Sequence, residues 1–195
     1  MRVYPIIYNC LVLSLLSSIS LKAQDTSVEK SLFGIQTGFW GFWGYHEARL
    51  DPKWALRTEV GIFDYFGLAE GLHFEPILTL EPRWYYNRKN RLEKAKRIDD
   101  NSGNFIAFKT SLRPDVFAIP VNTYQERKNL SISFVPTIGT RKNIGKKFNY
   151  ELGFGLGIEY FSKGGAGFSI FADENPDDDK FGPAFNLHLR VGYKL

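Results

Sequence analysis

The residues of this chain whose types and spacing could do chemistry are arginines, lysines and glutamates that alternate with apolar residues. Arg57 and Glu59 lie two positions apart, as do Glu81 and Arg83. In an extended strand, residues two apart point to the same side, so each pair would share one face. The charged residues with this placement are Arg57, Glu59, Glu81, Arg83, Lys109, Arg113, Arg141, Glu151, Glu159, Arg190 and Lys194.

We expect these charged side chains to share one interior and to form a closed polar network. Their signs nearly balance, and buried charges must be paired and hydrogen-bonded. Arginine suits such pairs because its planar guanidinium can bind a carboxylate through two parallel hydrogen bonds. An ion or proton path through the same groups is the alternative.

The single cysteine, Cys10, begins an apolar stretch that ends at Leu21, between Arg2 and Ala23. A positive start, about 12 apolar residues and a small residue at the end are typical of a secretory signal, and the run is too short to span a bilayer. We expect residues 1–23 to be a cleaved signal peptide rather than a buried helix, and residues 24–195 to form one domain. A mature chain without cysteine excludes disulfide, thiol and cysteine–metal chemistry.

The remaining charges argue against nucleic-acid and metal partners. Without the two basic residues of the signal, the chain has 23 basic and 21 acidic residues, which gives no case for nucleic-acid binding. The acidic segment 173–184 resembles a calcium loop only weakly, because Asp178 stands where glycine is needed and Ala184 where glutamate is needed. We expect no metal site and no cofactor.

Apolar and polar residues alternate along most of the mature chain, as in strands with two different faces. From Phe148 to Tyr160 the even positions are apolar or aromatic and the odd positions are asparagine, glutamate and glycine. A similar alternation runs from Phe185 to Leu195. We expect about eight strands: one beginning near residue 32, others at 54–62, 74–86, 106–113, 130–141, 148–160 and 185–195, and a short one at 167–172.

Some segments interrupt this alternation. Pro76, Pro82 and Pro136 fall inside expected strands, where each removes a ladder hydrogen bond. The alternation of the first strand slips between residues 41 and 44, which suggests a bulge. The one helical segment expected is 90–97, within a connection.

The apolar face is large and aromatic on nearly every expected strand, while the polar face is rich in glycine and charge. Aromatic residues also gather toward strand ends, as at the two membrane–water interfaces. The residues assigned to these aromatic belts are Phe39, Trp40, Phe42, Trp43, Tyr45, Tyr65, Phe66, Trp84, Tyr85, Tyr86, Tyr160 and Phe161. The sequence therefore predicts an all-β fold: an antiparallel up-and-down transmembrane β-barrel of about eight strands with a polar lumen.

A soluble, lipocalin-like binding barrel is the strongest alternative fold. The Gly-x-Trp pattern of the first lipocalin strand occurs twice, ending at Trp40 and at Trp43. A lipocalin needs an apolar interior, however, and these strands place charge on the face opposite the bulky residues.

Several segments resemble the small eight-stranded outer-membrane β-barrel proteins of OmpA-transmembrane or OmpX type, especially those of Bacteroidota. These segments are Leu80–Asn87, Asn101–Asn104, Arg141–Gly145 leading into Phe148–Glu151, and Leu189–Tyr193. The resemblance covers essentially the whole mature chain, and its motifs are architectural. It implies an outer-membrane location in a Gram-negative bacterium, contact with outer-membrane lipid and lipopolysaccharide, assembly by the barrel-insertion machinery, and a monomer.

The expected role is structural or surface-interacting, with no catalysis. Some barrels of this size modify lipid A, but none of His46, His73 and His188 is followed two residues later by serine, as in lipid A deacylase barrels. A surface adhesin or ligand-binding barrel is an alternative, and a lipid A-modifying enzyme another. With both termini periplasmic, we expect the outward connections at 51–53, 88–103, 142–147 and 173–183, so that the basic second loop and the acidic fourth loop lie on the same side.

Overall fold

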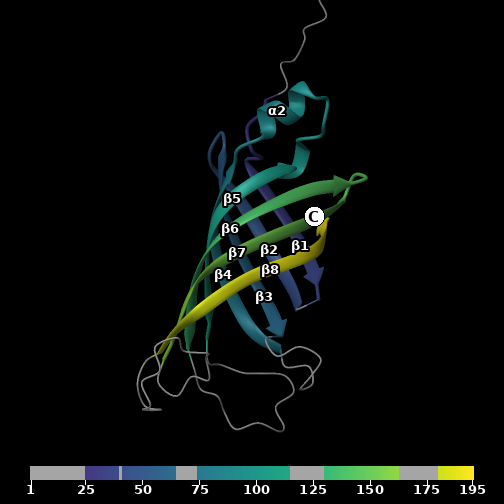
Figure 1. The fold of residues 1–195 in the computed structure, drawn as a ribbon. Coiled ribbons are helices and arrows are strands. Elements are labelled where there is room, and N and C mark those ends of the chain that lie inside the picture. Colours follow the sequence, from purple (N-terminus) through teal and green to yellow (C-terminus); the bar gives the residue numbers. More distant parts are fainter. Residues whose placement is uncertain (1–24, 40, 65–73, 115–129, 163–179) are drawn as a thin grey trace, which may run out of the picture.

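The computed structural model describes residues 25–39, 41–64, 74–114, 130–162 and 180–195, and it shows a closed barrel of eight antiparallel strands (Figure 1). Each strand pairs with its neighbours in sequence, and β1 closes the barrel against β8. The strands are β1 Ser31–Gly38, β2 Gly41–Asp51, β3 Trp54–Asp64, β4 Phe74–Tyr85, β5 Gly103–Arg113, β6 Ser131–Ile144, β7 Phe148–Phe161 and β8 Lys180–Lys194. The expected all-β, eight-stranded antiparallel barrel is confirmed. The expected signal peptide, residues 1–23, lies outside the described residues.

The period-two pattern of the sequence separates the inside of the barrel from the outside. In β7, Phe154, Leu156 and Ile158 are more than half exposed on the outer surface. Glu151 and Glu159 are buried inside. The alternation arises because successive strand side chains point to opposite faces of the sheet.

The region around residues 31–51 corrects the prediction of a single first strand with a bulge. Gly38 pairs with Gly41, so the chain reverses through a two-residue turn, and the strand becomes the hairpin β1–β2. Gln36 points inside from an even position, whereas Trp43 points inside from an odd one. The slip in alternation is therefore this turn. Gly41 has φ 150, and a Cβ there would lie 2.0 Å from the carbonyl oxygen of Ile62. The expected strand at 167–172 falls outside the described residues.

Each proline inside a strand lies where the ladder is interrupted on one side. Pro82 pairs with Leu56 of β3, while the pairing of β4 with β5 skips from Leu80 to Arg83. Pro136 pairs with Phe108 of β5, while the β6–β7 pairing skips residues 135 and 136. Because proline has no backbone N–H, one edge of the ladder must open at such positions.

The hairpin β1–β2 also corrects the expected placement of the connections. It reverses the direction of every later strand, so the connections 51–53, 88–103 and 142–147 lie at the same end as Asp25 and Leu195. We call this the terminal end. The β1–β2 turn and the connections 65–73, 114–130 and 162–179 join strands at the opposite end. The ends of β7 and β8 that the acidic segment 173–183 joins therefore lie at the other end from the basic connection 88–103, contrary to the prediction. Residues 163–179 themselves lie outside the described part of the chain.

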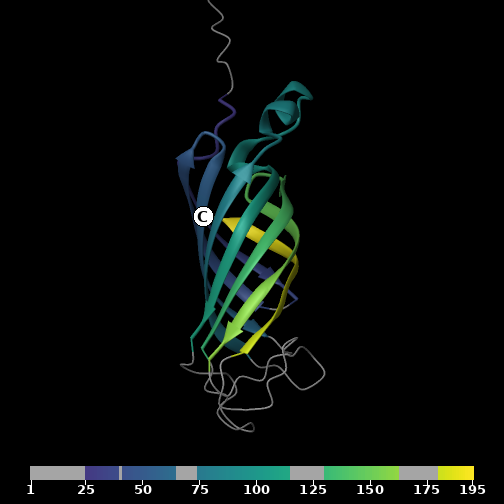
Figure 2. The same cartoon turned by 60° about the vertical axis from the view of Figure 1, so that its left-hand side comes forward.

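Two short helices lie at the terminal end: α2, Arg88–Glu93, which projects beyond the strand ends (Figures 1 and 2), and η2, Asp99–Asn101. The helix expected at 90–97 thus begins two residues earlier and ends at residue 93. Among the described residues, no helix is both long and apolar enough to cross a membrane.

The segment before β1 also belongs to the terminal end. Val28 is fully buried in an apolar cluster with Ala55, Tyr85, Phe105 and Ala107. Its backbone N–H donates to the carbonyl oxygen of Pro52 at 2.9 Å. The cluster borders the charged interior, because the Tyr85 hydroxyl also donates to Glu47 Oε2.

Candidate functional site

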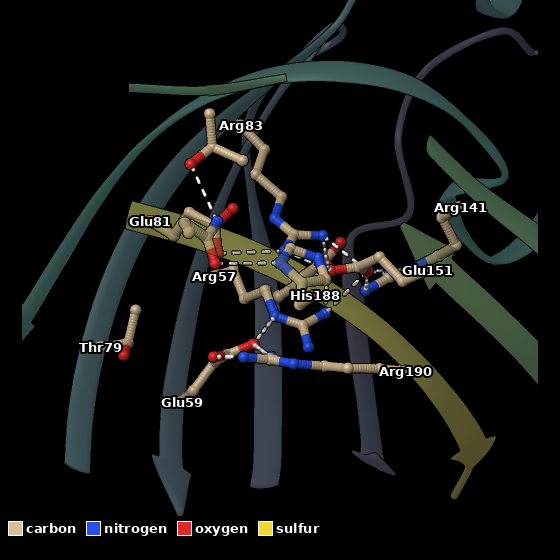
Figure 3. Close-up of polar contacts among 12 residues, drawn as sticks. Arg57, Glu59, Thr79, Glu81, Arg83, Arg141, Glu151, His188 and Arg190 are labelled. Carbon is tan, nitrogen blue, oxygen red and sulfur yellow. Dashed lines mark hydrogen bonds and ion pairs between the residues drawn. The ribbon is translucent and has the colours of Figure 1, made fainter. Parts of the chain in front are cut away.

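The interior of the barrel contains two carboxylates, Glu47 and Glu151, which form ion pairs with three arginines. Glu47 comes from β2 and Glu151 from β7, while Arg57, Arg83 and Arg141 come from β3, β4 and β6. All five side chains are fully buried. Figure 3 shows the three guanidinium groups converging on Glu151 across the barrel. The cluster thus links five of the eight strands through their side chains.

Arg83 makes the most extensive contacts in this cluster. Its Nη1 and Nη2 donate to Glu151 Oε2 and Oε1 at 2.9 and 2.7 Å, a paired arrangement that matches guanidinium to carboxylate (Figure 3). Nη2 also donates to Glu81 Oε2 at 3.0 Å. The two strands that carry Arg83 and Glu151 are not neighbours in the sheet, so this pair spans the interior.

Glu47 is held by contacts from several directions. Arg141 Nη1 lies 2.8 Å and Arg57 Nη1 3.0 Å from Glu47 Oε1. The Tyr85 hydroxyl donates to Oε2 at 3.2 Å, and Asn101 Nδ2 donates to the same oxygen at 2.7 Å. Donors at both oxygens and three cations nearby offset the cost of burying this charge.

A second ion pair extends the network toward the opposite end. Arg190 Nη1 donates to both oxygens of Glu59 at 2.9 and 3.1 Å, and Arg57 also pairs with Glu59. The Arg190 guanidinium lies 3.8 Å from the ring centroid of Trp43, and that of Arg57 lies 3.8 Å from the ring of Tyr45. Each guanidinium group thus makes a cation–π contact with an aromatic ring, while its N–H groups, which lie in the guanidinium plane, remain free to bind carboxylates.

His188 joins the network beside Glu151. Its Nε2 lies 3.4 Å from Glu151 Oε1, and its Nδ1 lies 3.1 Å from Asn186 Oδ1. A Cβ at Gly153 would lie 2.4 Å from the ring, so a glycine at this position makes room for the histidine. The glycines of β7 therefore serve interior packing.

The terminal end is closed above the cluster by the connection that carries α2 and η2. The backbone N–H of Glu29 donates to Asn101 Oδ1 at 2.7 Å, while Asn101 itself reaches down to Glu47. Arg88 donates to the carbonyl oxygens of Thr26 and Ser27 at 2.8 and 2.7 Å. Burial lowers the pKa of Arg88 from its usual value. The segment before β1 is thereby tied across the barrel mouth.

The structure brings most of the charged residues singled out by the sequence into one interior. Nine of them are buried there: Arg57, Glu59, Glu81, Arg83, Lys109, Arg141, Glu151, Glu159 and Arg190. Arg113 is partly exposed and pairs with Glu159 near the opposite end. Lys194 is partly exposed at the terminal end, where its Nζ lies 2.7 Å from Asp100 Oδ1, outside the cluster.

Sequence reasoning missed Glu47 and assigned some aromatic residues to the wrong face. Glu47 follows the β1–β2 turn, and the odd positions that point inward there are visible only once the turn is recognised. Trp43, Tyr45, Tyr85 and Phe161 were expected on the outer aromatic belts. Instead all four point inside and are at most 9% exposed.

The outer aromatic residues that the structure describes do lie near strand ends. Phe39 lies in the β1–β2 turn and Phe42 follows it, while Trp84 and Tyr86 lie on either side of Tyr85, the last residue of β4; all four are exposed. Trp40, Tyr65 and Phe66 of the expected belts lie outside the described residues.

His46 offers the one arrangement on the outer wall that invites comparison with a catalytic pair. Its Nε2 lies 2.9 Å from Ser31 Oγ, and its ring stacks on Phe33 at 4.1 Å between centroids. Nucleophilic catalysis also needs a group that orients the base. Within the described part of the chain, no ion pair joins His46 to a carboxylate, and no group of three or more histidine, cysteine or acidic residues could hold a metal.

The charged side chains inside the barrel form a packed network of salt bridges rather than a row of separated charges. The connection that carries α2 and η2 lies over this network at the terminal end. Inside the barrel, five buried glutamates (47, 59, 81, 151 and 159) face four buried arginines (57, 83, 141 and 190) and the buried Lys109. A comparison of the chain with protein-family models, curated proteins and solved structures finds no match.

Proposed function

We propose that this chain is an integral outer-membrane β-barrel whose interior is closed by its charge network, with a structural or surface-interaction role. The observation that carries the proposal is the distribution of side chains between the two faces of the barrel. Charged groups fill the inside, and large apolar groups cover the outside. In a water-soluble protein, apolar side chains lie mainly inside and charged side chains mainly outside, so this distribution is reversed.

The outer surface is apolar on strands all around the barrel. Phe33 and Ile35 of β1, Val60 of β3 and Leu80 of β4 are each more than half exposed. On β8, Phe185 and Leu187 are 73% and 68% exposed. Soluble monomers rarely expose contiguous apolar patches beyond a few hundred Å². A lipid bilayer would cover such a surface at no hydrophobic cost.

The interior argues against a soluble barrel that binds an apolar ligand. In such a fold the inside of the barrel is the apolar side, but here Arg57, Arg83 and Arg141 are buried inside and each pairs with Glu151. An eight-stranded barrel is just wide enough for its side chains to fill. We infer that the network acts as a structural plug.

The connections support an orientation with the terminal end in the periplasm. In bacterial outer-membrane barrels the periplasmic turns are short and the extracellular loops longer. Here two of the three connections at the terminal end, β2–β3 and β6–β7, are short, and the third, 86–102, carries α2 and η2. Three of the four connections at the opposite end have nine or more residues. In this orientation the opposite end meets lipopolysaccharide, and the barrel-insertion machinery would assemble the chain as a monomer.

The proposal includes no catalytic role. Ser31 and His46 face the proposed lipid side, but the Phe33 ring covers one face of the imidazole. We expect lipid A isolated from cells with and without the protein to carry the same acyl chains.

The test of the proposal is the gel mobility of the full-length protein from the membrane fraction, with and without boiling. A folded outer-membrane barrel resists the detergent until heated, so two bands of different mobility are expected. Recovery of the protein in the soluble periplasmic fraction, with one mobility in both samples, would contradict a membrane barrel.

A further inference from the structure

Charge is distributed unequally between the two ends of the barrel. The segments at the terminal end, 25–30, 49–53, 86–102 and 142–147 together with Lys194, contain thirteen lysines and arginines against six acidic residues. The connections at the opposite end contain four lysines and arginines against nine acidic residues; these connections are 64–74, 114–130 and 162–180. The terminal end is therefore the basic end of the molecule, and its natural partners carry negative charge.

Part of this positive charge lies on the outer wall, at the level of the strand ends. Lys142, Lys146 and Lys147 of the β6–β7 hairpin are all exposed. Lys142 is next to inward-pointing Arg141 and so faces outward, where it pairs in register with Tyr150 of β7. We call these three lysines the hairpin patch.

Aromatic and apolar groups border the hairpin patch. Lys147 Nζ lies 5.3 Å from the ring centroid of Tyr193, and that ring packs against Phe148 at 5.3 Å. Ile144 and Phe148 are 51% and 52% exposed beside the lysines. Farther down the same wall, Leu152, Leu189 and Val191 are also about half exposed. Positive charge thus lies directly above an apolar wall.

This layout matches a ligand with a phosphate at one end and hydrocarbon at the other. Lysine is a compact, strongly hydrated cation that can approach a phosphate as a point charge. Its long stem lets the ammonium group reach the headgroup level from an apolar wall. Basic residues next to a bilayer surface attract anionic lipids.

We propose that the hairpin patch binds the phosphate of an anionic glycerophospholipid, whose acyl chains lie along the outer wall of β6, β7 and β8. The inference rests on the proposed membrane location of the barrel and adds a lipid partner at its terminal end. The lysines near α2, Lys89, Lys94 and Lys96, are equally exposed, but α2 projects beyond the strand ends (Figure 1). They provide a matched control, because they carry the same charge on the connection that contains α2 rather than on the β6–β7 hairpin.

The test is photocrosslinking in vesicles that contain equal amounts of phosphatidylglycerol and phosphatidylcholine with identical acyl chains. The crosslinker p-benzoylphenylalanine replaces Val191, which faces outward two residues before Tyr193. Three full-length proteins are compared: one with all lysines present, the hairpin variant Lys142→Gln/Lys146→Gln/Lys147→Gln, and the control variant Lys89→Gln/Lys94→Gln/Lys96→Gln. Mass spectrometry gives the ratio of the two lipid adducts.

We expect adducts with phosphatidylglycerol to exceed those with phosphatidylcholine at least about threefold with all lysines present, because each lysine near the surface attracts anionic lipid. The hairpin variant should lose this preference, and the control variant should keep it. Equal loss in both variants, or no preference at the start, would overturn the proposed site while the barrel remains a membrane protein. Absence of all lipid adducts together with unchanged gel mobility on boiling would instead overturn the membrane location.

Discussion

At the scale of single residues, the stability of the barrel depends on the ion pairs that three arginines form with two buried glutamates. Removing one partner of a buried pair leaves the other charge uncompensated, which costs more than the pair contributes. Arg83 is the most sensitive position, because Glu151 receives two of its hydrogen bonds and Glu81 a third. Glu151 would keep Arg141 as its main partner, with Nη2 at 2.7 Å from Oε2.

We predict that Arg83→Ala lowers the free energy of unfolding by about 3–5 kcal/mol, the usual cost of breaking a buried ion pair. Urea unfolding, followed by the heat-dependent gel shift, measures the change. The control is Arg97→Ala, which breaks the pair with Asp99, whose two side chains are 45% and 44% exposed. An exposed pair contributes less than about 1 kcal/mol. Equal effects of the two substitutions would contradict the account of the cluster.

The sequence predicted most of the charged cluster but not its centre. Arg57, Glu81, Arg83, Arg141 and Glu151 could be placed inside because each lies in a regular strand, where position alone gives the face. Glu47 could not, because a two-residue turn shifts the alternation just before it. Asn101 lies in η2, outside any strand, so no periodicity marks its reach toward Glu47.

At the scale of elements, the hairpin β1–β2 decides the topology. Its two-residue turn depends on Gly41, whose φ of 150 falls in a region that residues with a Cβ rarely adopt. Because the prediction from the sequence did not include this turn, it placed three connections at the wrong end of the barrel, although it gave the right number of strands. The alternation of apolar and polar residues shows which face of a strand a residue occupies, but it does not show where the chain reverses direction. The sequence alone therefore could not show at which end of the barrel each connection lies.

We predict that Gly41→Ala destabilises the barrel by about 1–3 kcal/mol, the cost of one residue held in a sparsely populated conformation. The added Cβ would also meet the carbonyl oxygen of Ile62. Gly44→Ala is the control, since a Cβ there has only the Val60 carbonyl oxygen within 4 Å, at 3.9 Å. Urea midpoints of the two variants provide the comparison, and a Gly41→Ala protein as stable as the control would contradict the strained turn.

At the scale of the whole molecule, the fold has an inverted distribution of polarity and an uneven distribution of charge. A mean hydropathy of −0.24 averages two faces that never share an environment. The apolar face is the outer wall, the charged face is the interior, and the terminal end carries the excess of lysine and arginine. These three features together support our proposal that the molecule lies across a boundary between lipid and water.

The central claim is that the outer wall contacts lipid, and a spin label on that wall tests it most directly. Leu156 of β7 is 54% exposed and lies in mid-strand. A full-length Cys10→Ser/Leu156→Cys protein, labelled and reconstituted in vesicles, is measured for relaxation by oxygen, which concentrates in lipid, and by a water-soluble nickel complex. We predict that relaxation by oxygen dominates at this position. Dominant relaxation by the nickel complex would place the outer wall in water and contradict the membrane barrel.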